Sequence, residues 1–246
     1  MKREVAPRFW PIPRKRFHWV VKPSPGPHPM ERCIPLVLIV RDILGFAKTR
    51  REAKRIISEG KILVDGKVRR DERFPAGLMD VISIPEIGVS YRILPYKKGL
   101  YLHQIEGEEV NFKLCRVEGK TTVDGGHIEL NLHDGRNVLI RVKDPRNPVE
   151  DVYRVFDVLK IGFRNGQEVL GHLRFDEGKF AIIIGGKNIG EYGRIISVER
   201  REGVKRERSL VTIEDENGNS YQTTLNYIFV IGDEKPLISL PRLEVA

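Results

Sequence analysis

Two short helices are predicted between residues 35 and 60 of the chain. The first begins at Pro35, whose fixed φ suits a first helical position, and ends before Gly45. Its residues are apolar on nearly every side, so periodicity alone also permits a buried strand. The second helix is marked more clearly, because Thr49 and Glu52 have the spacing of a capping box.

Alternating apolar and polar positions predict strands after these helices. Asp65-Gly66 lies between two such runs and is typical of a type I′ hairpin turn, which needs positive φ at both central residues. Residues 80–85 supply a further strand. The pattern therefore predicts a small module of two helices and a sheet that ends near residue 95.

From about residue 96 the pattern is that of a β protein. A second alternating hairpin surrounds Asp134-Gly135, and turns are predicted at Asn165-Gly166 and Asn217-Gly218. Short strands at this spacing favour small barrels over a parallel sheet. The fold class expected for the whole chain is therefore α+β and multidomain.

A glycine-rich loop at residues 185–193 joins two hydrophobic strands. It lacks the GK[ST] ending of a P-loop, and a strand follows it where a dinucleotide fingerprint needs a helix. Its glycines allow close backbone approach, so Lys187 and Arg194 are candidate phosphate ligands.

The first 35 residues contain eight of the fifteen prolines and both tryptophans. Proline lacks an N–H and fixes φ, so this segment is expected to be extended and mobile. A basic run lies between two aromatic pairs, in the order Phe9, Trp10, Arg14-Lys15-Arg16, Phe17, Trp19. Either the segment orders along RNA or its aromatic rings pack back onto their own domain, and both can hold for different rings.

The positive charge is concentrated in the first third of the chain. Residues 1–75 contain 19 Lys and Arg against 8 Asp and Glu, whereas the rest contains 24 against 26. Such a local excess indicates a polyanion, most commonly a phosphate backbone. A membrane surface is the alternative, but the sequence offers no amphipathic or lipidated anchor and no apolar run near the roughly 20 residues that cross a bilayer. The expected partner is RNA, with no membrane.

Four cations follow one another at helical spacing in the predicted second helix: Arg50, Arg51, Lys54 and Arg55. Like charges four residues apart cost an isolated helix roughly a few tenths of a kcal/mol per pair, so stability alone does not account for them. A merely solvated face is the alternative. The residues predicted to bind RNA in this part of the chain are Arg14, Lys15, Arg16, Trp19, Lys48, Arg50, Arg51, Lys54, Arg55, Lys61, Lys67, Arg69, Arg70 and Arg73.

No pattern in the sequence indicates catalysis. Cys33 and Cys115 are far apart and form neither a disulfide framework nor a zinc motif, which is typical of a reducing cytoplasm. The six histidines show no ligand spacing, and no GxSxG elbow is present. We therefore expect no metal, no cofactor and no small-molecule substrate.

Five strings carry a resemblance to a known family: WPI at Trp10–Ile12, VKPSPGPHP at Val21–Pro29, REAKRII at Arg51–Ile57, EGKILVDGKVRRD at Glu59–Asp71 and FPAGLMDVISIPE at Phe74–Glu86. Over essentially its full length the chain resembles the archaeal and eukaryotic small-subunit ribosomal proteins of the S4e family. The resemblance implies a non-enzymatic cytoplasmic protein of the ribosome. Its implied partners are small-subunit ribosomal RNA and neighbouring small-subunit proteins.

The resemblance also implies four parts of the chain. They are a basic N-terminal extension at 1–35, an S4-type RNA-binding domain at 36–95, a central β domain at 96–172 and a KOW-type SH3-like barrel at 173–246. Gly186, Gly190 and Gly193 are assigned to the KOW motif. Its loop is only modestly basic and contains Glu191, so the resemblance implies weaker RNA contact there than in the first third.

Two other functions are compatible with parts of this pattern. The same RNA-binding module resembles one appended to pseudouridine synthases, but Gly135-Arg136-Asn137 lacks the catalytic aspartate of their GRLD-like string. A transcription or translation factor could use the KOW barrel to contact a polymerase. That factor would concentrate its function in the C-terminal half, whereas the charge lies in the other half.

Overall fold

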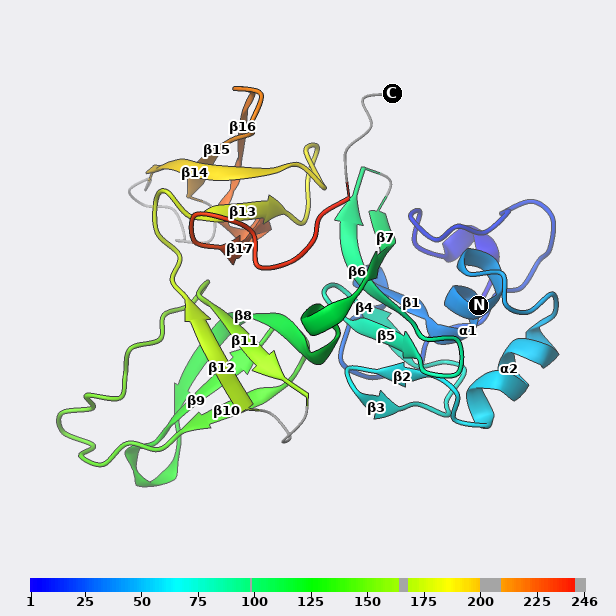
Figure 1. Ribbon diagram of the computed structural model, residues 1–246, viewed down its shortest axis with the longest axis horizontal. Coiled ribbons are helices and arrows are strands. Elements are labelled where there is room, and N and C mark those ends of the chain that lie inside the picture. Colours follow the sequence, from blue (N-terminus) through cyan, green and yellow to red (C-terminus); the bar gives the residue numbers. More distant parts are fainter. Residues whose placement is uncertain (98, 164–167, 200–208, 242–246) are drawn as a thin grey trace. The chain divides into compact units, whose positions relative to one another are not determined.

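The computed structural model describes residues 1–97, 99–163, 168–199 and 209–241. It is a mixture of few helices and several β-sheets, which confirms the α+β class (Figure 1). The chain divides into two compact units. We call residues 1–94, 98–113 and 163–166 the N-terminal unit, and residues 95–97, 114–162 and 167–246 the C-terminal unit. Within the described ranges, every helix is too short or too polar to span a bilayer.

The first predicted helix is present, and its first five residues are buried. Its α-helical turn α1 (Leu36–Leu38) continues as a π-helical turn at Ile39–Ile43. Residues 36–40 are each at most 1% exposed, which explains why the run is apolar on nearly every side. Pro35 ends strand β1 (Cys33–Pro35) and precedes the helix, so the predicted start is wrong by one residue.

The second predicted helix, α2 (Arg50–Ser58), begins at the capping box that the sequence indicates. The Thr49 hydroxyl accepts the Glu52 N–H at 3.3 Å, and the Glu52 carboxylate accepts the Thr49 N–H at 3.3 Å. Ala53 and Ile57 are fully buried in the core of the N-terminal unit. The helix therefore turns its remaining, mostly charged, side chains toward solvent.

A five-stranded sheet completes the N-terminal unit. Its strands are, in spatial order, β3 (Lys67–Val68), β2 (Leu63–Val64), β5 (Val81–Ile84), β6 (Val89–Tyr96) and β7 (Gly99–Ile105). Asp65 and Gly66 have φ of 52° and 72°, which confirms the two-residue hairpin turn between β2 and β3. A separate two-stranded pair joins β1 to β4 (Pro75–Gly77). The sequence pattern predicts that the module ends near residue 95. The sheet instead continues past this residue into β7.

The first 35 residues fold onto this unit, which corrects the expectation of an extended, mobile tail. Trp10 is 3% exposed, and its indole N–H donates to the Cys33 carbonyl at 2.8 Å. Ile12 and Val20 are also buried in the same core. The alternative in which aromatic rings pack on their own domain is therefore confirmed for Trp10, whereas Trp19 remains 65% exposed.

The C-terminal unit contains two five-stranded sheets. The first has the spatial order β10 (Asn137–Ile140), β9 (Ile128–Leu132), β8 (Phe112–Thr122), β11 (Val158–Gly162), β12 (Glu168–Leu173). The second has the order β16 (Ser220–Thr224), β15 (Leu210–Glu214), β14 (Tyr192–Glu199), β13 (Phe180–Ile183), β17 (Ile228–Gly232). Hairpins at Asp134-Gly135 and Asn217-Gly218 are confirmed by the β9–β10 and β15–β16 pairings. The predicted turn at Asn165-Gly166 lies outside the described residues.

Candidate nucleic-acid interface

Helix α2 presents its four predicted cations to solvent, although Arg50 also pairs with a carboxylate. Arg51, Lys54 and Arg55 are exposed, since Ala53 and Ile57 take the buried side of the helix. Arg55 donates to Glu59 at 2.9 Å, but its side chain is still 82% exposed. These side chains can therefore reach phosphates without breaking a buried contact.

Arg50 has a partner that the sequence pattern does not reveal. Its guanidinium donates to both carboxylate oxygens of Glu72, at 2.6 Å and 3.2 Å. The Glu72 side chain is 9% exposed, and hydrogen bonding to it raises the pKa of Arg50. Arg50 thus fastens the start of α2 to the segment before β4.

The β2–β3 hairpin adds cations next to α2. Lys67 is exposed close to the turn, and Lys61 pairs with Glu59 at 3.2 Å and Glu86 at 3.3 Å. Those hydrogen bonds raise the pKa of Lys61, so it is charged at neutral pH. Arg69 lies over the Phe74 ring, 4.4 Å from its centroid.

The remaining predicted residues of this region are Lys48, Arg70 and Arg73, and all three are exposed. The Arg73 guanidinium also donates to the Lys22 carbonyl at 2.9 Å. Cations from three consecutive pieces of chain, namely the loop before α2, α2 itself and the hairpin region, therefore lie on the surface of one compact unit.

Arg14 has an intramolecular role that sequence reasoning missed. Its guanidinium donates to the carbonyls of Arg3 at 3.1 Å, Ala6 at 3.0 Å and Pro7 at 2.7 Å. It therefore holds the first residues of the chain in a loop, and its predicted contact with RNA remains a prediction. The neighbouring Lys15 and Arg16 are exposed.

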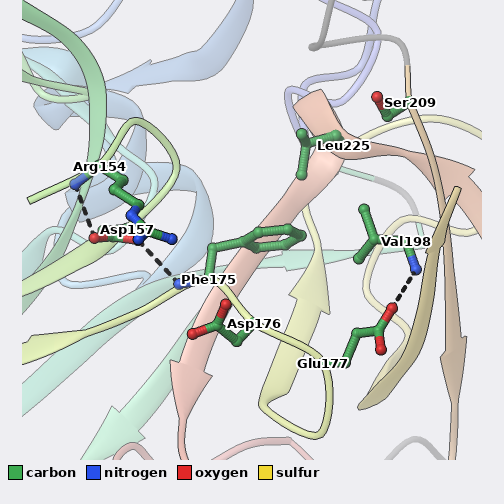
Figure 2. A pocket seen from close by; sticks show the side chains of 8 residues that line it. All are labelled: Arg154, Asp157, Phe175, Asp176, Glu177, Val198, Ser209 and Leu225. Atoms are coloured by element: carbon green, nitrogen blue, oxygen red, sulfur yellow. Dashed lines mark hydrogen bonds between the residues drawn. The ribbon is translucent and has the colours of Figure 1, made fainter. Parts of the chain in front are cut away.

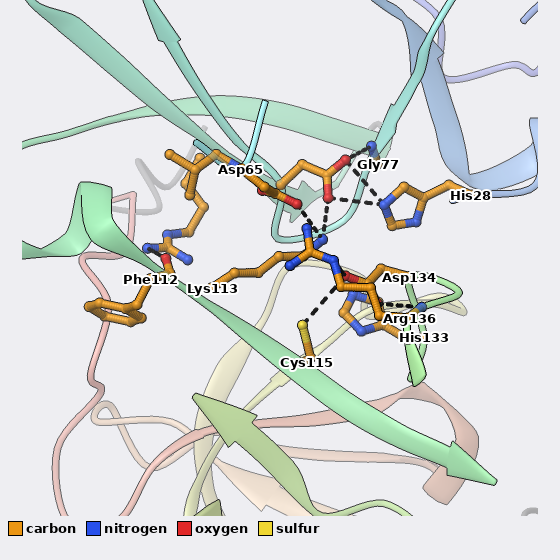
Figure 3. Close-up of polar contacts among 12 residues, drawn as sticks. His28, Asp65, Gly77, Phe112, Lys113, Cys115, His133, Asp134 and Arg136 are labelled. Carbon is orange, nitrogen blue, oxygen red and sulfur yellow. Dashed lines mark hydrogen bonds and ion pairs between the residues drawn. The ribbon is translucent and has the colours of Figure 1, made fainter. Parts of the chain in front are cut away.

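A buried network of charges lies inside the N-terminal unit (Figure 3). Lys113 pairs with Asp65 at 3.1 Å and also with Asp80. The Asp80 carboxylate contacts His28 at 3.0 Å as well and accepts the Gly77 N–H at 2.8 Å. Burial alone would raise the pKa of Asp80, but the charges of Lys113 and His28 outweigh it and hold that pKa well below its usual range. The network joins four separate pieces of chain, so no local sequence pattern indicates it.

The glycine-rich loop of the C-terminal unit is less basic in its surroundings. Lys187 is exposed, and Arg194 donates to the Glu234 carbonyl at 3.3 Å. Burial, followed by the negative charges of Glu216, Asp215 and Glu191, raises the pKa of Tyr192. Acidic groups therefore accompany the two cations that are predicted to bind phosphate here.

The C-terminal unit also has a cavity of about 460 Å³ with several acidic groups in its wall (Figure 2). Asp157 accepts the backbone N–H groups of Arg154 at 2.9 Å and Phe175 at 3.0 Å. Glu177 accepts the Val198 N–H at 3.0 Å. These two carboxylates hold the walls of the cavity in place, which is a structural role.

Cys115, His133 and Asp134 place one ligand atom each within 4.8 Å of one another (Figure 3). His133 Nδ1 accepts the Arg116 N–H at 3.2 Å, and the Cys115 thiol donates to Asp134 at 3.5 Å. Arg136 pairs with the same carboxylate at 3.1 Å. These polar contacts account for the positions of the three side chains.

Comparison with protein families divides the chain into four consecutive matches. They are the RS4NT (NUC023) domain at residues 1–31, the S4 domain at 35–82, the ribosomal family S4e at 87–167 and the 40S ribosomal protein S4 C-terminus at 215–244. The S4 match covers α1, α2 and the β2–β3 hairpin. Most of the exposed cations described above thus lie in one matched domain.

Individual relatives match almost the whole chain. Small ribosomal subunit protein eS4 of Staphylothermus marinus is 56% identical over 98% of this chain and 95% of its own length. The protein of the same name from Aeropyrum pernix is 57% identical over 98% and 94%. The crystal structure of the 30S ribosomal protein S4e from Thermoplasma acidophilum has a TM-score of 0.66 and 30% identity, and it covers 82% of this chain and 96% of that one.

Proposed function

The chain belongs to the S4e family of ribosomal proteins and is a structural constituent of the small ribosomal subunit, and from this premise we propose that its N-terminal unit binds the RNA of that subunit. The observation that carries the proposal is the group of exposed cations on α2 and the hairpin beside it. Each phosphate that such a group neutralises releases a counterion, which favours binding.

Binding through this surface depends on the shape of the RNA. An A-form helix hides its base edges in a narrow major groove, so side chains recognise mainly the positions of phosphates and 2′-hydroxyls. Arg51, Lys54 and Arg55 project from one rigid helix, and Lys67 and Arg70 from the neighbouring hairpin region. The protein would thereby hold folded segments of ribosomal RNA together during assembly of the subunit.

We divide the chain into the four parts that the family implies, at 1–35, 36–95, 96–172 and 173–246. The last part would be a KOW-type SH3-like barrel, which the five-stranded order β16-β15-β14-β13-β17 supports. Gly193 supports it as well, because a Cβ there would lie 2.1 Å from the Glu214 carbonyl oxygen, so only glycine fits. The acidic groups near Tyr192 favour neighbouring small-subunit proteins as partners of this part.

The proposal includes no catalytic step, cofactor or small-molecule substrate, and it places the protein on the ribosome in the cytoplasm. Asp157 and Glu177 in the wall of the 460 Å³ cavity accept backbone N–H groups, which supports structural roles for these two carboxylates. Relatives that match 98% of the chain carry the name of a small-subunit protein. That full-length match disfavours both a pseudouridine synthase and a KOW-containing transcription or translation factor.

Sedimentation of a cell lysate through a sucrose gradient tests the proposal. The protein should follow the small subunit at constant stoichiometry and should stay with it through a moderate salt wash. A peak at the top of the gradient, or loss at mild salt, would indicate a transient factor and would contradict the proposal.

A further inference from the structure

Three consecutive aromatic residues form a ridge on the surface of the N-terminal unit. Phe17 is 58% exposed and Trp19 is 65% exposed, and the His18 ring packs edge-on against Trp19 with centroids 4.6 Å apart. We call residues 17–19 the aromatic ridge. Burial of large aromatic side chains is normally stabilising, so two exposed aromatic side chains on one short segment indicate a binding partner.

The ridge is held in place by the first residues of the chain. The terminal ammonium of Met1 donates to the Val20 carbonyl at 2.9 Å, and the Val20 N–H donates back to the Met1 carbonyl at 2.9 Å. Arg3, which is 5% exposed, donates to the Trp19 carbonyl at 3.1 Å and the Pro13 carbonyl at 2.6 Å. The backbone is thus ordered before any partner arrives, which lowers the entropy cost of binding.

Two cations lie next to the Phe17 ring of the ridge. The guanidinium groups of Arg3 and Arg16 lie 5.0 Å and 5.5 Å from the Phe17 ring centroid. Such contacts fix the ring plane and keep positive charge next to it. A planar ligand that stacks on this ridge would therefore meet cations at its edge.

Residues of the ridge line two hollows in the surface. One has a volume of about 840 Å³ and includes Phe17, Trp19, Arg16 and Lys48 in its wall. The other has a volume of about 600 Å³, shares Arg16 and Phe17, and adds Lys15. Basic side chains outnumber acidic ones in both walls, so both hollows suit an anion.

We propose that the aromatic ridge and its two hollows bind unpaired nucleotides of single-stranded RNA, with a base stacked on Trp19 and phosphates beside Arg16 and Lys48. The inference rests on the proposed function, since ribosomal RNA supplies the strand. Unpaired bases expose their faces to aromatic side chains, whereas the bases of a duplex are already stacked on one another. An acidic peptide would pair with the cations, but its carboxylate side chains offer no flat face to stack on the aromatic rings.

The chain contains its own reporter for this binding. It has only two tryptophans, and Trp10 is buried while Trp19 is exposed, so a ligand that stacks on the ridge should quench Trp19 alone. The full chain is titrated with a short oligouridine, with an RNA duplex of equal phosphate number and with polyglutamate. The expected result is saturable quenching by oligouridine and little quenching by the other two. Equal quenching by the duplex, or quenching by polyglutamate alone, would overturn the inference.

Variants at position 19 complete the test. Trp19→Ala should weaken oligouridine binding by about tenfold or more, and Trp19→Phe should restore much of it, because both aromatic residues offer a stacking face. Since Trp19 is exposed, Trp10 emission and the melting temperature should stay unchanged. Unaltered affinity in Trp19→Ala overturns the inference but leaves the proposed function intact if the variant still sediments with the small subunit. Failure of the unmodified protein to sediment there would contradict the proposed function itself.

Discussion

His28 and Asp80 meet inside the N-terminal unit, with 3.0 Å between Nε2 and Oδ1 and both side chains 2% exposed. They are 52 residues apart in the sequence. His28 belongs to the proline-rich segment, and Asp80 precedes strand β5, so this contact fastens the N-terminal segment to the sheet. Gly77 makes the close approach possible, because a Cβ at that position would lie 2.3 Å from the His28 ring.

Replacing Asp80 by Asn should destabilise the N-terminal unit by about 3 kcal/mol, because the buried Lys113 would lose a buried carboxylate partner. Urea unfolding followed by circular dichroism measures the change. Asp42→Asn is the matched control, since Asp42 pairs with Arg41 at the surface and its loss should cost about 0.5 kcal/mol or less. Equal stability of the two variants would show that the buried network contributes little.

Acid should remove the stabilisation that Asp80 provides. The pKa of Asp80 is lowered in the folded protein, whereas an unfolded aspartate has a pKa of about 3.9. A group with a lowered folded pKa stabilises the fold above its unfolded pKa and loses that contribution as the pH falls below it. The difference in unfolding free energy between the unmodified chain and Asp80→Asn should therefore narrow by about 1.4 kcal/mol per pH unit below about pH 4. A constant difference from pH 7 to pH 3 would contradict this assignment.

Arg14→Ala should lower the melting temperature in the absence of RNA, whereas Lys15→Ala should not. The Arg14 guanidinium donates to the carbonyls of Arg3, Ala6 and Pro7, and hydrogen bonds from a charged group contribute about 1.5–3 kcal/mol. Lys15 is an exposed neighbour of the same charge. Differential scanning calorimetry of both variants gives the comparison. Identical melting temperatures of the two variants would show that the hydrogen bonds of Arg14 contribute little to stability. Arg14 would then remain only a predicted contact with RNA.

The Cys33 thiol should resist alkylation in the folded protein. Burial raises its pKa to about 12, with smaller contributions from the negative charges of Glu31 and Asp80. Because the thiolate is the reactive form, iodoacetamide at pH 8 should modify Cys33 at least about a thousandfold more slowly than an unfolded cysteine. Mass spectrometry of the Cys33 peptide measures the rate, and the reaction in urea is the control. Equal rates with and without urea would show that this part of the core opens readily.

Local signals in the sequence predict local structure well in this chain. Thr49 and Glu52 predict the start of α2, and Asp65-Gly66 predicts the β2–β3 turn, because each signal depends only on residues within one turn of the chain. Asp65 also makes a contact that local sequence signals do not predict. Its carboxylate pairs with Lys113 at 3.1 Å, 48 residues away, and nothing in the turn pattern indicates a buried partner.

In the candidate site, too, the sequence predicts the features that depend on local spacing and misses those that depend on distant partners. Helical spacing predicts that Arg51 and Arg55 lie on the exposed side of α2, because the buried positions of one helix are fixed by its own period. The partner of Arg50 depends on where the chain returns after β3, so the sequence does not reveal Glu72. Arg14 is missed for a related reason, since its acceptors are backbone carbonyls, which every residue has.

Loss of Arg51 and Arg55 should reduce the salt dependence of RNA binding. Each phosphate contact contributes about 0.7–0.9 to the slope of log K against log salt, so the double change to Ala should flatten the slope by about 1.4–1.8. Filter binding of a small-subunit ribosomal RNA fragment at several salt concentrations measures the slope. The control is Lys143→Ala, which removes an exposed cation from the C-terminal unit and should leave the slope unchanged. A slope that stays constant after both substitutions on α2 would remove Arg51 and Arg55 from the residues that contact phosphate. An equal reduction in the control would indicate a general charge effect with no localised interface on the N-terminal unit.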